Sequence, residues 1–180
     1  MKTFSLMVFA IALTLGLSAC MEEEIVDLPS PAQLTQEPVG YYCSMTVADH
    51  KGPKGQIWLK SKDQPIWFSS VRDTITFTLL AEEPKDIRAI YVTDMSTDES
   101  WESPKSYQWI DINTAHFVTG SFRAGGMGAP EPVPFASKES AKKFSLRHGG
   151  KVVAYSKIAD GSTLGPAESV DHQPDAEHEG

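Results

Sequence analysis

In the first half of the predicted domain, at about residues 39–95, the spacing of apolar residues changes along the chain between a pattern typical of strands and one typical of a helix. Three runs of β-branched and aromatic residues are typical of short strands: residues 55–61, 64–69 and 87–95. Between the last two, residues 70–82 begin with a serine that can cap a helix and place apolar side chains at helical spacing, at Val71, Ile75 and Leu79. The pattern therefore predicts the order strand, strand, helix, strand.

The second half of this region shows the same order of patterns. Its strand-like runs are residues 115–121, 132–137 and 151–158. Residues 137–150 are typical of a helix, because Ser137 stands at the N-cap position and the pair Gly149 and Gly150 ends the pattern. A second unit of strand, strand, helix and strand is therefore predicted.

A repeat links the two halves. Four residues recur at an offset of 67 positions: Pro65 and Pro132, Phe68 and Phe135, Ser70 and Ser137, Phe77 and Phe144. This alignment supports the first helix, whose β-branched residues locally favour a strand. The sequence predicts an α+β fold in which two homologous ββαβ units, at about 39–95 and 109–158, form one domain over 39–159.

The two units are expected to pack against each other. Each has one apolar sheet face and one apolar helix stripe, and a unit of this size cannot cover both alone. The cleft between the packed units is the natural place for a binding site.

The N-terminus has the features of an export signal. Lys2 is followed by an apolar run that is too short to span a membrane, and the run ends in Leu-Ser-Ala-Cys, which resembles a bacterial lipobox. We therefore expect a lipoprotein signal peptide at 1–19 and lipidation of Cys20. Met21 follows instead of an aspartate, so the expected location is the periplasmic face of the outer membrane.

Two other segments are acidic and poor in large apolar residues. Residues 20–38 are expected to form a flexible tether between the lipid anchor and the domain, and residues 160–180 a disordered tail. The tail contains two histidines, which such solvated segments often carry without binding a metal.

Charge and cysteine content narrow the function. The full chain has a formal net charge of −8, and loss of Lys2 with the leader makes it one unit more negative, which argues against a nucleic-acid partner. If Cys20 carries lipid, Cys43 has no partner for an internal disulfide. A free thiol in an oxidising compartment is either buried or used.

Cys43 and Met45 are the first candidate metal ligands. The stretch around them, YYCSMTV, is expected to be extended, so that side chains two residues apart point to the same side. A thiolate and a thioether are soft ligands that suit Cu(I), whereas zinc would require more nitrogen or thiolate donors. The alternative for Met45 is a gap-filling position in the core.

Met127 is the candidate third ligand. It lies in a glycine-rich loop between two predicted strands. Its neighbours allow the backbone to bend so that the thioether can approach another element closely: Gly125, Gly126 and Gly128. The alternative is that Met127 covers an apolar patch.

Other donors are less specific. His50 lies in a turn-rich stretch near Cys43 and could supply a nitrogen ligand, although an exposed loop position would also explain it. His116 falls within a predicted strand, and His148 is explained by attraction to a helix C-terminus. Met95 ends a strand and could be a ligand or a packing residue.

With these residues in place, the chain resembles the NosL family of copper-binding lipoproteins that assist nitrous oxide reductase. The resemblance covers Tyr41 to about Ile158 and rests on Trp101 and eight stretches: residues 43–45, 49–58, 67–73, 90–95, 109–121, 125–130, 134–144 and 148–155. It implies a chaperone that holds Cu(I) and delivers it to apo nitrous oxide reductase for assembly of the copper-sulfide centre. The family's C-x-M residues correspond to Cys43 and Met45, and its glycine-flanked methionine to Met127.

Two other functions are open at this point. Cys43 could be the nucleophile or redox thiol of an enzyme, with His50 or Lys51 nearby to lower its pKa. It could also be an inert, buried thiol in a structural lipoprotein. The absence of a second cysteine to resolve an oxidised intermediate argues against the enzyme, so a carrier without catalytic activity is the leading expectation.

Overall fold

The computed structural model describes residues 28–34, 38–97, 99–102 and 107–158. The predicted signal peptide, Cys20, the first part of the tether and the acidic tail lie outside these residues. Within them, no helix is both long and apolar enough to span a bilayer.

The first unit is a four-stranded antiparallel sheet with one helix. Its strands have the order β2-β1-β3-β4, and the elements are β1 (Gly55–Leu59), β2 (Ile66–Phe68), α2 (Val71–Leu79), β3 (Ile87–Thr93) and β4 (Trp109–Asp111). Helix α2 begins after Ser70, whose hydroxyl accepts a hydrogen bond from the Asp73 N–H. The predicted order of strand, strand, helix and strand is confirmed.

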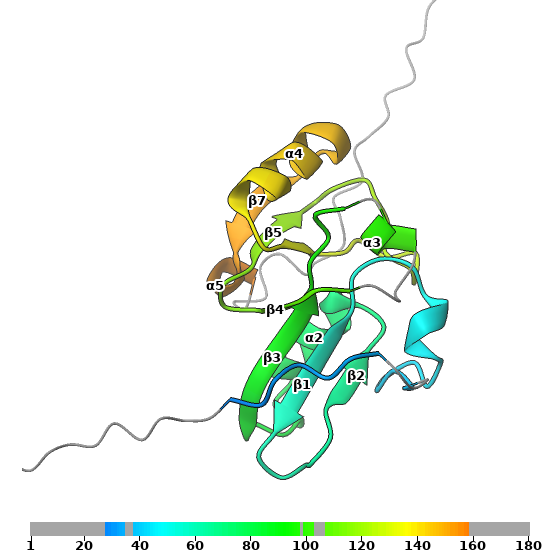
Figure 1. Cartoon of the computed structure of the whole chain (residues 1–180), viewed down its shortest axis with the longest axis vertical. Helices are drawn as coiled ribbons and strands as arrows, with labels where there is room; N and C mark the ends of the chain where they lie inside the picture. Colours follow the sequence, from blue (N-terminus) through cyan, green and yellow to red (C-terminus); the bar gives the residue numbers. More distant parts are fainter. Residues whose placement is uncertain (1–27, 35–37, 98, 103–106, 159–180) are drawn as a thin grey trace, which may run out of the picture.

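The second unit repeats this order around a three-stranded antiparallel sheet. Its strands have the order β6-β5-β7, and the elements are β5 (His116–Thr119), β6 (Val133–Phe135), α4 (Lys138–His148) and β7 (Lys151–Ala154). Ser137 caps α4 by accepting from the Ser140 N–H, and Gly149, with φ 71°, follows the last turn. Figure 1 shows α4, β5 and β7 together at one end of the molecule, beyond the first sheet.

Two segments differ from the sequence-based expectation. Strand β4 pairs with β3, so a stretch that the repeat assigned to the second unit extends the first sheet. Strand β7 ends at Ala154 and is followed by the short helix α5 (Tyr155–Ile158), so the prediction of a strand over the last four residues was wrong. The helical turn directs Ile158 into the core, where its side chain is fully buried.

The two units share their cores. One cluster fills the space between the first sheet and α2, and it also contains residues from the second half of the chain: Ile112, Ala115, Phe117 and Ile158. The other surrounds α4 and contains Met95 and Trp101 from outside the second unit. Because burying one such side chain contributes about 1.5–3 kcal/mol, these exchanged residues tie the units together.

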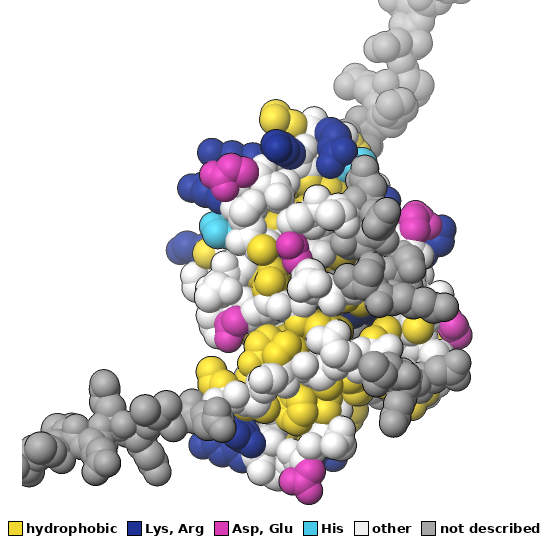
Figure 2. Space-filling view, viewed as in Figure 1, with side chains coloured by type: hydrophobic (Ala, Val, Ile, Leu, Met, Phe, Trp, Pro, Cys, Tyr) yellow, Lys and Arg dark blue, Asp and Glu magenta, His cyan; other side chains and the backbone are white. Residues whose placement is uncertain are grey.

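Part of the predicted tether lies on the first sheet. The Gln56 side-chain amide accepts from the Ala32 N–H at 2.9 Å and donates to the Ala32 carbonyl at 3.0 Å. The Tyr91 hydroxyl donates to the Pro29 carbonyl at 2.7 Å. In Figure 1 this segment crosses in front of β3 and β1, and Figure 2 shows hydrophobic side chains gathered on the same face.

Candidate metal centre

Cys43 lies in a closed turn. The Gly40 N–H donates to the Met45 carbonyl at 2.9 Å, and the Ser44 N–H donates to the Gly40 carbonyl at 2.8 Å. Val39 pairs with Thr46 in an isolated antiparallel bridge. The expectation of an extended segment was therefore wrong, because this bridge requires the chain to reverse direction between its two residues. The two-residue period of a strand does not place Cys43 and Met45 on one side.

The thiol packs against the start of the first helix. Cys43 is a free, half-buried cysteine, and its Sγ atom lies 3.3 Å from the Ser69 hydroxyl oxygen. Gly40 lies directly beneath this contact, since a Cβ atom there would be 2.6 Å from Sγ and 2.7 Å from the Ser69 oxygen. The close fit leaves no room for a side chain at position 40.

Met45 points out of the core. Its side chain is 43% exposed, so the gap-filling alternative does not describe it. The same turn carries Tyr41 and Tyr42, whose hydroxyls donate to the Glu83 carboxylate at 3.1 and 2.8 Å. The hydrogen bond to Glu83 raises the pKa of Tyr41, and burial raises that of Tyr42. The two tyrosines hold the turn to the loop between α2 and β3, while Met45 stays accessible.

Met127 lies at the tip of a tight turn between β5 and β6. The Gly125 N–H donates to the Ala129 carbonyl and the Gly128 N–H to the Gly125 carbonyl, each at 2.9 Å. Gly128 has a φ of 76°, which a residue with a side chain rarely adopts. Met127 is 42% exposed, so its thioether is open to solvent.

The Met127 turn lies against the segment that follows the Cys43 turn. The backbone of Gly126 contacts Lys51 so closely that a Cβ atom would overlap the Lys51 backbone, and Gly52 is adjacent to the same turn. The helical turn η1 (Val47–Asp49) connects Met45 to this segment. The structure thus brings the loop of the third candidate ligand to the chain segment just beyond the first two.

Helix α3 and the segment around Arg123 also contact the region where Lys51 and Gly52 meet the Met127 turn. The Gly52 N–H donates to the carbonyl of Trp101, a residue of α3 (Glu99–Glu102). The Arg123 guanidinium lies 4.0 Å from the centre of the Trp101 ring. The Lys51 ammonium pairs with Glu102 at 2.5 Å. This ion pair directs the Lys51 ammonium toward α3.

Sequence reasoning did not single out Glu131 and Lys54, two buried charged residues beside the Met127 turn. Glu131 is 4% exposed, and its Oε1 atom accepts from the Val71 and Arg72 N–H groups at 2.6 and 3.1 Å. Burial raises the pKa of Glu131 to about 8. A signal was the acidic side chain between Pro130 and Pro132, at the edge of an otherwise apolar strand.

Lys54 is fully buried. Its ammonium donates to the carbonyls of Lys51 and Gly52 at 2.9 and 2.7 Å. Burial lowers the pKa of Lys54 to about 8, although its attraction to Glu131 opposes this shift. Its hydrogen bonds fix the backbone on which the Met127 turn rests.

The remaining candidates have different surroundings. Met95 is buried in the core around α4 and accepts a hydrogen bond from the Thr93 hydroxyl, so it is a packing residue. The His148 ring packs on Phe144. Among the described residues, His50 Nε2 and His116 Nδ1 are buried without a hydrogen-bond partner. The predicted nitrogen ligand at His50 therefore stays a prediction.

The chemical nature of the available donor atoms limits which metal ion the site could bind. Over the described part of the chain, no group of three or more His, Cys, Asp or Glu side chains is arranged to hold an ion. The candidate donors are instead one thiol and two exposed thioethers, at Cys43, Met45 and Met127. Such a set fits a soft monovalent ion and is unsuited to calcium, magnesium or structural zinc.

Comparison with known proteins shows the family of the chain. The NosL family model matches residues 31–163. The chain belongs to the NosL family. A copper-binding lipoprotein NosL from Achromobacter cycloclastes is 42% identical over 167 residues, covering 92% of this chain and 84% of the relative. A second copper-binding lipoprotein NosL, from Stutzerimonas stutzeri, is 32% identical over 94% of this chain and 90% of its own length.

The NosL fold is also represented among solved structures. The crystal structure of the copper chaperone NosL from Shewanella denitrificans matches with a TM-score of 0.65 and 30% identity, covering 72% of this chain and 96% of that one. The resemblance to the NosL family and the mixed α and β architecture are thereby confirmed. The relatives are named as copper-binding lipoproteins and a copper chaperone, in line with the expectation of a carrier without catalytic activity.

Proposed function

We propose that this protein is a periplasmic Cu(I) chaperone that binds copper through Cys43, Met45 and Met127. The observation that carries the proposal is the turn at 40–46, where a free, half-buried thiol and an exposed thioether lie two residues apart. Relatives over most of the chain are named copper-binding lipoproteins. Thiolate and thioether donors are those that Cu(I) prefers.

The arrangement suits a carrier more than a storage site. Cys43 loses its proton when it binds the metal, so the thiolate forms the strongest of the three bonds. The two thioethers are neutral and about two-fifths exposed. An incoming donor can replace them one at a time while Cys43 still holds the ion, and transfer then ends when Cys43 is displaced and takes up a proton again.

The proposed client is apo nitrous oxide reductase, for assembly of its copper-sulfide centre. Lipidation at Cys20 would hold the protein at the periplasmic face of the membrane, with the outer membrane as the expected location. A membrane-held carrier raises the local concentration of copper where a periplasmic client can be loaded.

The test is a Cu(I) competition titration on the full chain against a high-affinity chelator. Substitution of Cys43 by Ser should abolish tight binding, and Met45→Leu and Met127→Leu should each weaken it. Met95→Leu is the matched control, since this methionine is buried in the core and should leave copper affinity unchanged. Full copper binding by the folded Cys43→Ser variant would refute the proposal.

Delivery requires a second measurement. The copper-loaded full chain should transfer copper to purified apo nitrous oxide reductase faster than an equal amount of chelated copper does. Equal rates would remove the client from the proposal and leave the copper site intact.

A further inference from the structure

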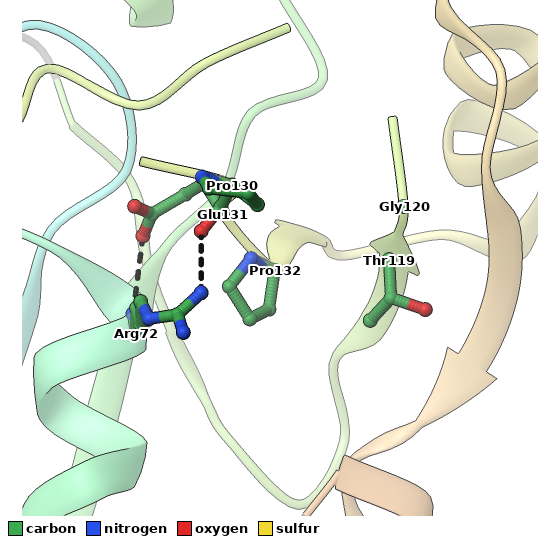
Figure 3. A pocket seen from close by; sticks show the side chains of 6 residues that line it. All are labelled: Arg72, Thr119, Gly120, Pro130, Glu131 and Pro132. Atoms are coloured by element: carbon green, nitrogen blue, oxygen red, sulfur yellow. Dashed lines mark hydrogen bonds between the residues drawn. The ribbon is translucent and has the colours of Figure 1, made fainter. Parts of the chain in front are cut away.

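Glu131 connects the two halves of the molecule at the start of α2. The first N–H groups of a helix have no partner within the helix, and those of Val71 and Arg72 donate to the Glu131 carboxylate. The Arg72 guanidinium donates in turn to the Pro130 carbonyl at 3.2 Å. Figure 3 shows the Glu131 carboxylate directed at the start of α2. The two segments are 60 residues apart in the sequence.

The same carboxylate also supports the Met127 turn. A Cβ atom at Gly125 would lie 2.5 Å from Glu131 Oε2, so the backbone of the turn rests on this side chain. On its other side the turn rests on the Lys51 backbone, which Lys54 fixes through hydrogen bonds. Two buried charged residues thus define where the turn can lie.

The helix end held by Glu131 is also the support of Cys43. Cys43 Sγ contacts the hydroxyl of Ser69, and Ser69 lies two residues before Val71. A continuous path therefore runs from the thiol through Ser69 and Val71 to Glu131, and from there to Gly125 and the Met127 turn. We propose that Glu131 is a positioning residue of the copper site, which holds the Met127 turn in register with the start of α2 beneath Cys43.

This inference rests on the proposed function and adds a residue that does not itself bind copper. The burial of Glu131 explains why it can act in this way, because a buried acceptor with two hydrogen bonds has far less freedom than an exposed one. The charged groups that interact with it are Lys54 and Asp73. Residues that orient metal ligands typically change metal affinity by roughly 10–100-fold when they are removed.

The experiment compares Glu131→Ala with Met127→Leu and with the double variant, all as full chains. If Glu131 acts by placing Met127, each single change should weaken Cu(I) binding at least tenfold in chelator competition. The double variant should then bind no more weakly than Met127→Leu alone. X-ray absorption of the copper-loaded Glu131→Ala variant should show one sulfur ligand fewer than the wild type.

Two further variants separate positioning from a general loss of stability. Glu131→Gln can still accept both hydrogen bonds at Oε1, so it should retain most of the affinity that Glu131→Ala loses. Asp94→Ala is the control for loss of a carboxylate that joins the two units, because Asp94 accepts from the Ala136 N–H at 3.0 Å outside the copper region. It should leave copper affinity unchanged.

Several results would overturn the inference. Additive losses in the double variant, or equal losses in Asp94→Ala, would mean that Glu131 acts only through overall stability. Unchanged binding in Met127→Leu would remove the ligand that Glu131 is said to position. In each of these cases Cys43→Ser would still lose copper, whereas copper binding by folded Cys43→Ser would defeat the proposed function itself.

Discussion

Helices α2 and α4 occupy matching positions in the repeat, and each is contacted near its start by a carboxylate from the other unit. The surroundings of these two carboxylates differ. Each helix begins with a capping serine, Ser70 for α2 and Ser137 for α4. At α2 the partner is the buried Glu131, whereas at α4 it is Asp94, whose hydrogen bond to the Ala136 N–H lies at the exposed surface. In both units a carboxylate accepts hydrogen bonds from backbone N–H groups near the start of a helix. Only the contact at α2 lies beside the candidate metal centre.

The difference lies in solvent exposure. An exposed carboxylate exchanges protein hydrogen bonds for water at little cost, so Asp94 contributes modestly. A buried carboxylate leaves its partners unsatisfied when it is removed. Four predictions test or sharpen this contrast.

The largest effect is expected for stability after removal of each carboxylate. Glu131→Ala should lower the free energy of unfolding by about 3 kcal/mol, because it leaves one buried and one partly buried N–H group without this acceptor. Asp94→Ala should cost about 1 kcal/mol. Urea unfolding followed by circular dichroism measures both, and equal losses would contradict the contrast.

Next in size is the effect of adding a methyl group to the Met127 turn. Gly126→Ala should cost about 2 kcal/mol, because the new Cβ would overlap the Lys51 backbone and force the turn away. Gly120→Ala is the control: its new Cβ would enter open space, so only the positive φ of 71° at this position opposes it, at a cost of about 1 kcal/mol. Thermal unfolding and Cu(I) titration of both variants check the difference, and copper affinity should fall only for Gly126→Ala.

A third prediction concerns pH, whose effect per pH unit is smaller than the two losses above. The pKa of Glu131 is raised to about 8 in the folded protein, above its ordinary value of 4.5. Its contribution to stability is therefore full below pH 4.5 and is lost as pH rises toward 8, with a slope of on the order of 1 kcal/mol per pH unit. Glu131→Gln should remove this part of the profile. Lys54, whose pKa is lowered, has the opposite sign between about pH 8 and 10.5.

Urea unfolding of wild type and Glu131→Gln at pH 5, 6, 7 and 8 measures the pH-dependent contribution of Glu131 to the free energy of unfolding. The stability difference between the two proteins should shift in favour of the glutamine variant as pH rises. A constant difference across this range would show that Glu131 does not titrate there.

The smallest effect concerns the segment at 28–34, which contacts the first sheet. Gln56→Ala should remove both hydrogen bonds to Ala32 and speed amide hydrogen exchange at this residue, with a stability loss of about 1 kcal/mol. Tyr91→Phe removes a single hydrogen bond to Pro29 and should have a smaller effect. Unchanged exchange at Ala32 in the Gln56 variant would show that the amide does not hold the segment.

Much of the fold could be predicted from local patterns. The capping serines, the apolar spacing of Val71 and Ile75, and the glycine pair after α4 act over a few residues and fix where the helices begin and end. The closed turn around Cys43 was missed because Val39 pairs with Thr46 across a reversal that the apolar pattern does not mark. Strand β4 was not predicted, and its residues were placed in the second unit, because strand partners are chosen by packing.

The candidate site also contains residues that the sequence predicts and residues that only the structure reveals. Its sulfur donors could be proposed from residue type alone, because the affinity of sulfur for soft ions belongs to the side chain. The burial of Glu131 and Lys54 could not, because charged residues are ordinarily exposed. The position of Glu131 between two prolines is a local signal, but it does not reveal which segment the side chain contacts. The burial of both charged residues follows from contacts between segments far apart in sequence.

The sequence by itself determined the order of elements, the duplicated plan and the chemical type of the candidate ligands, since these depend on short-range periodicity and on the side chains themselves. Only the tertiary structure decided that the Met127 turn lies against Lys51 and that Glu131 caps a helix of the other unit. The physical reason is that burial and close backbone approach arise only when two units pack together. No single segment contains that information.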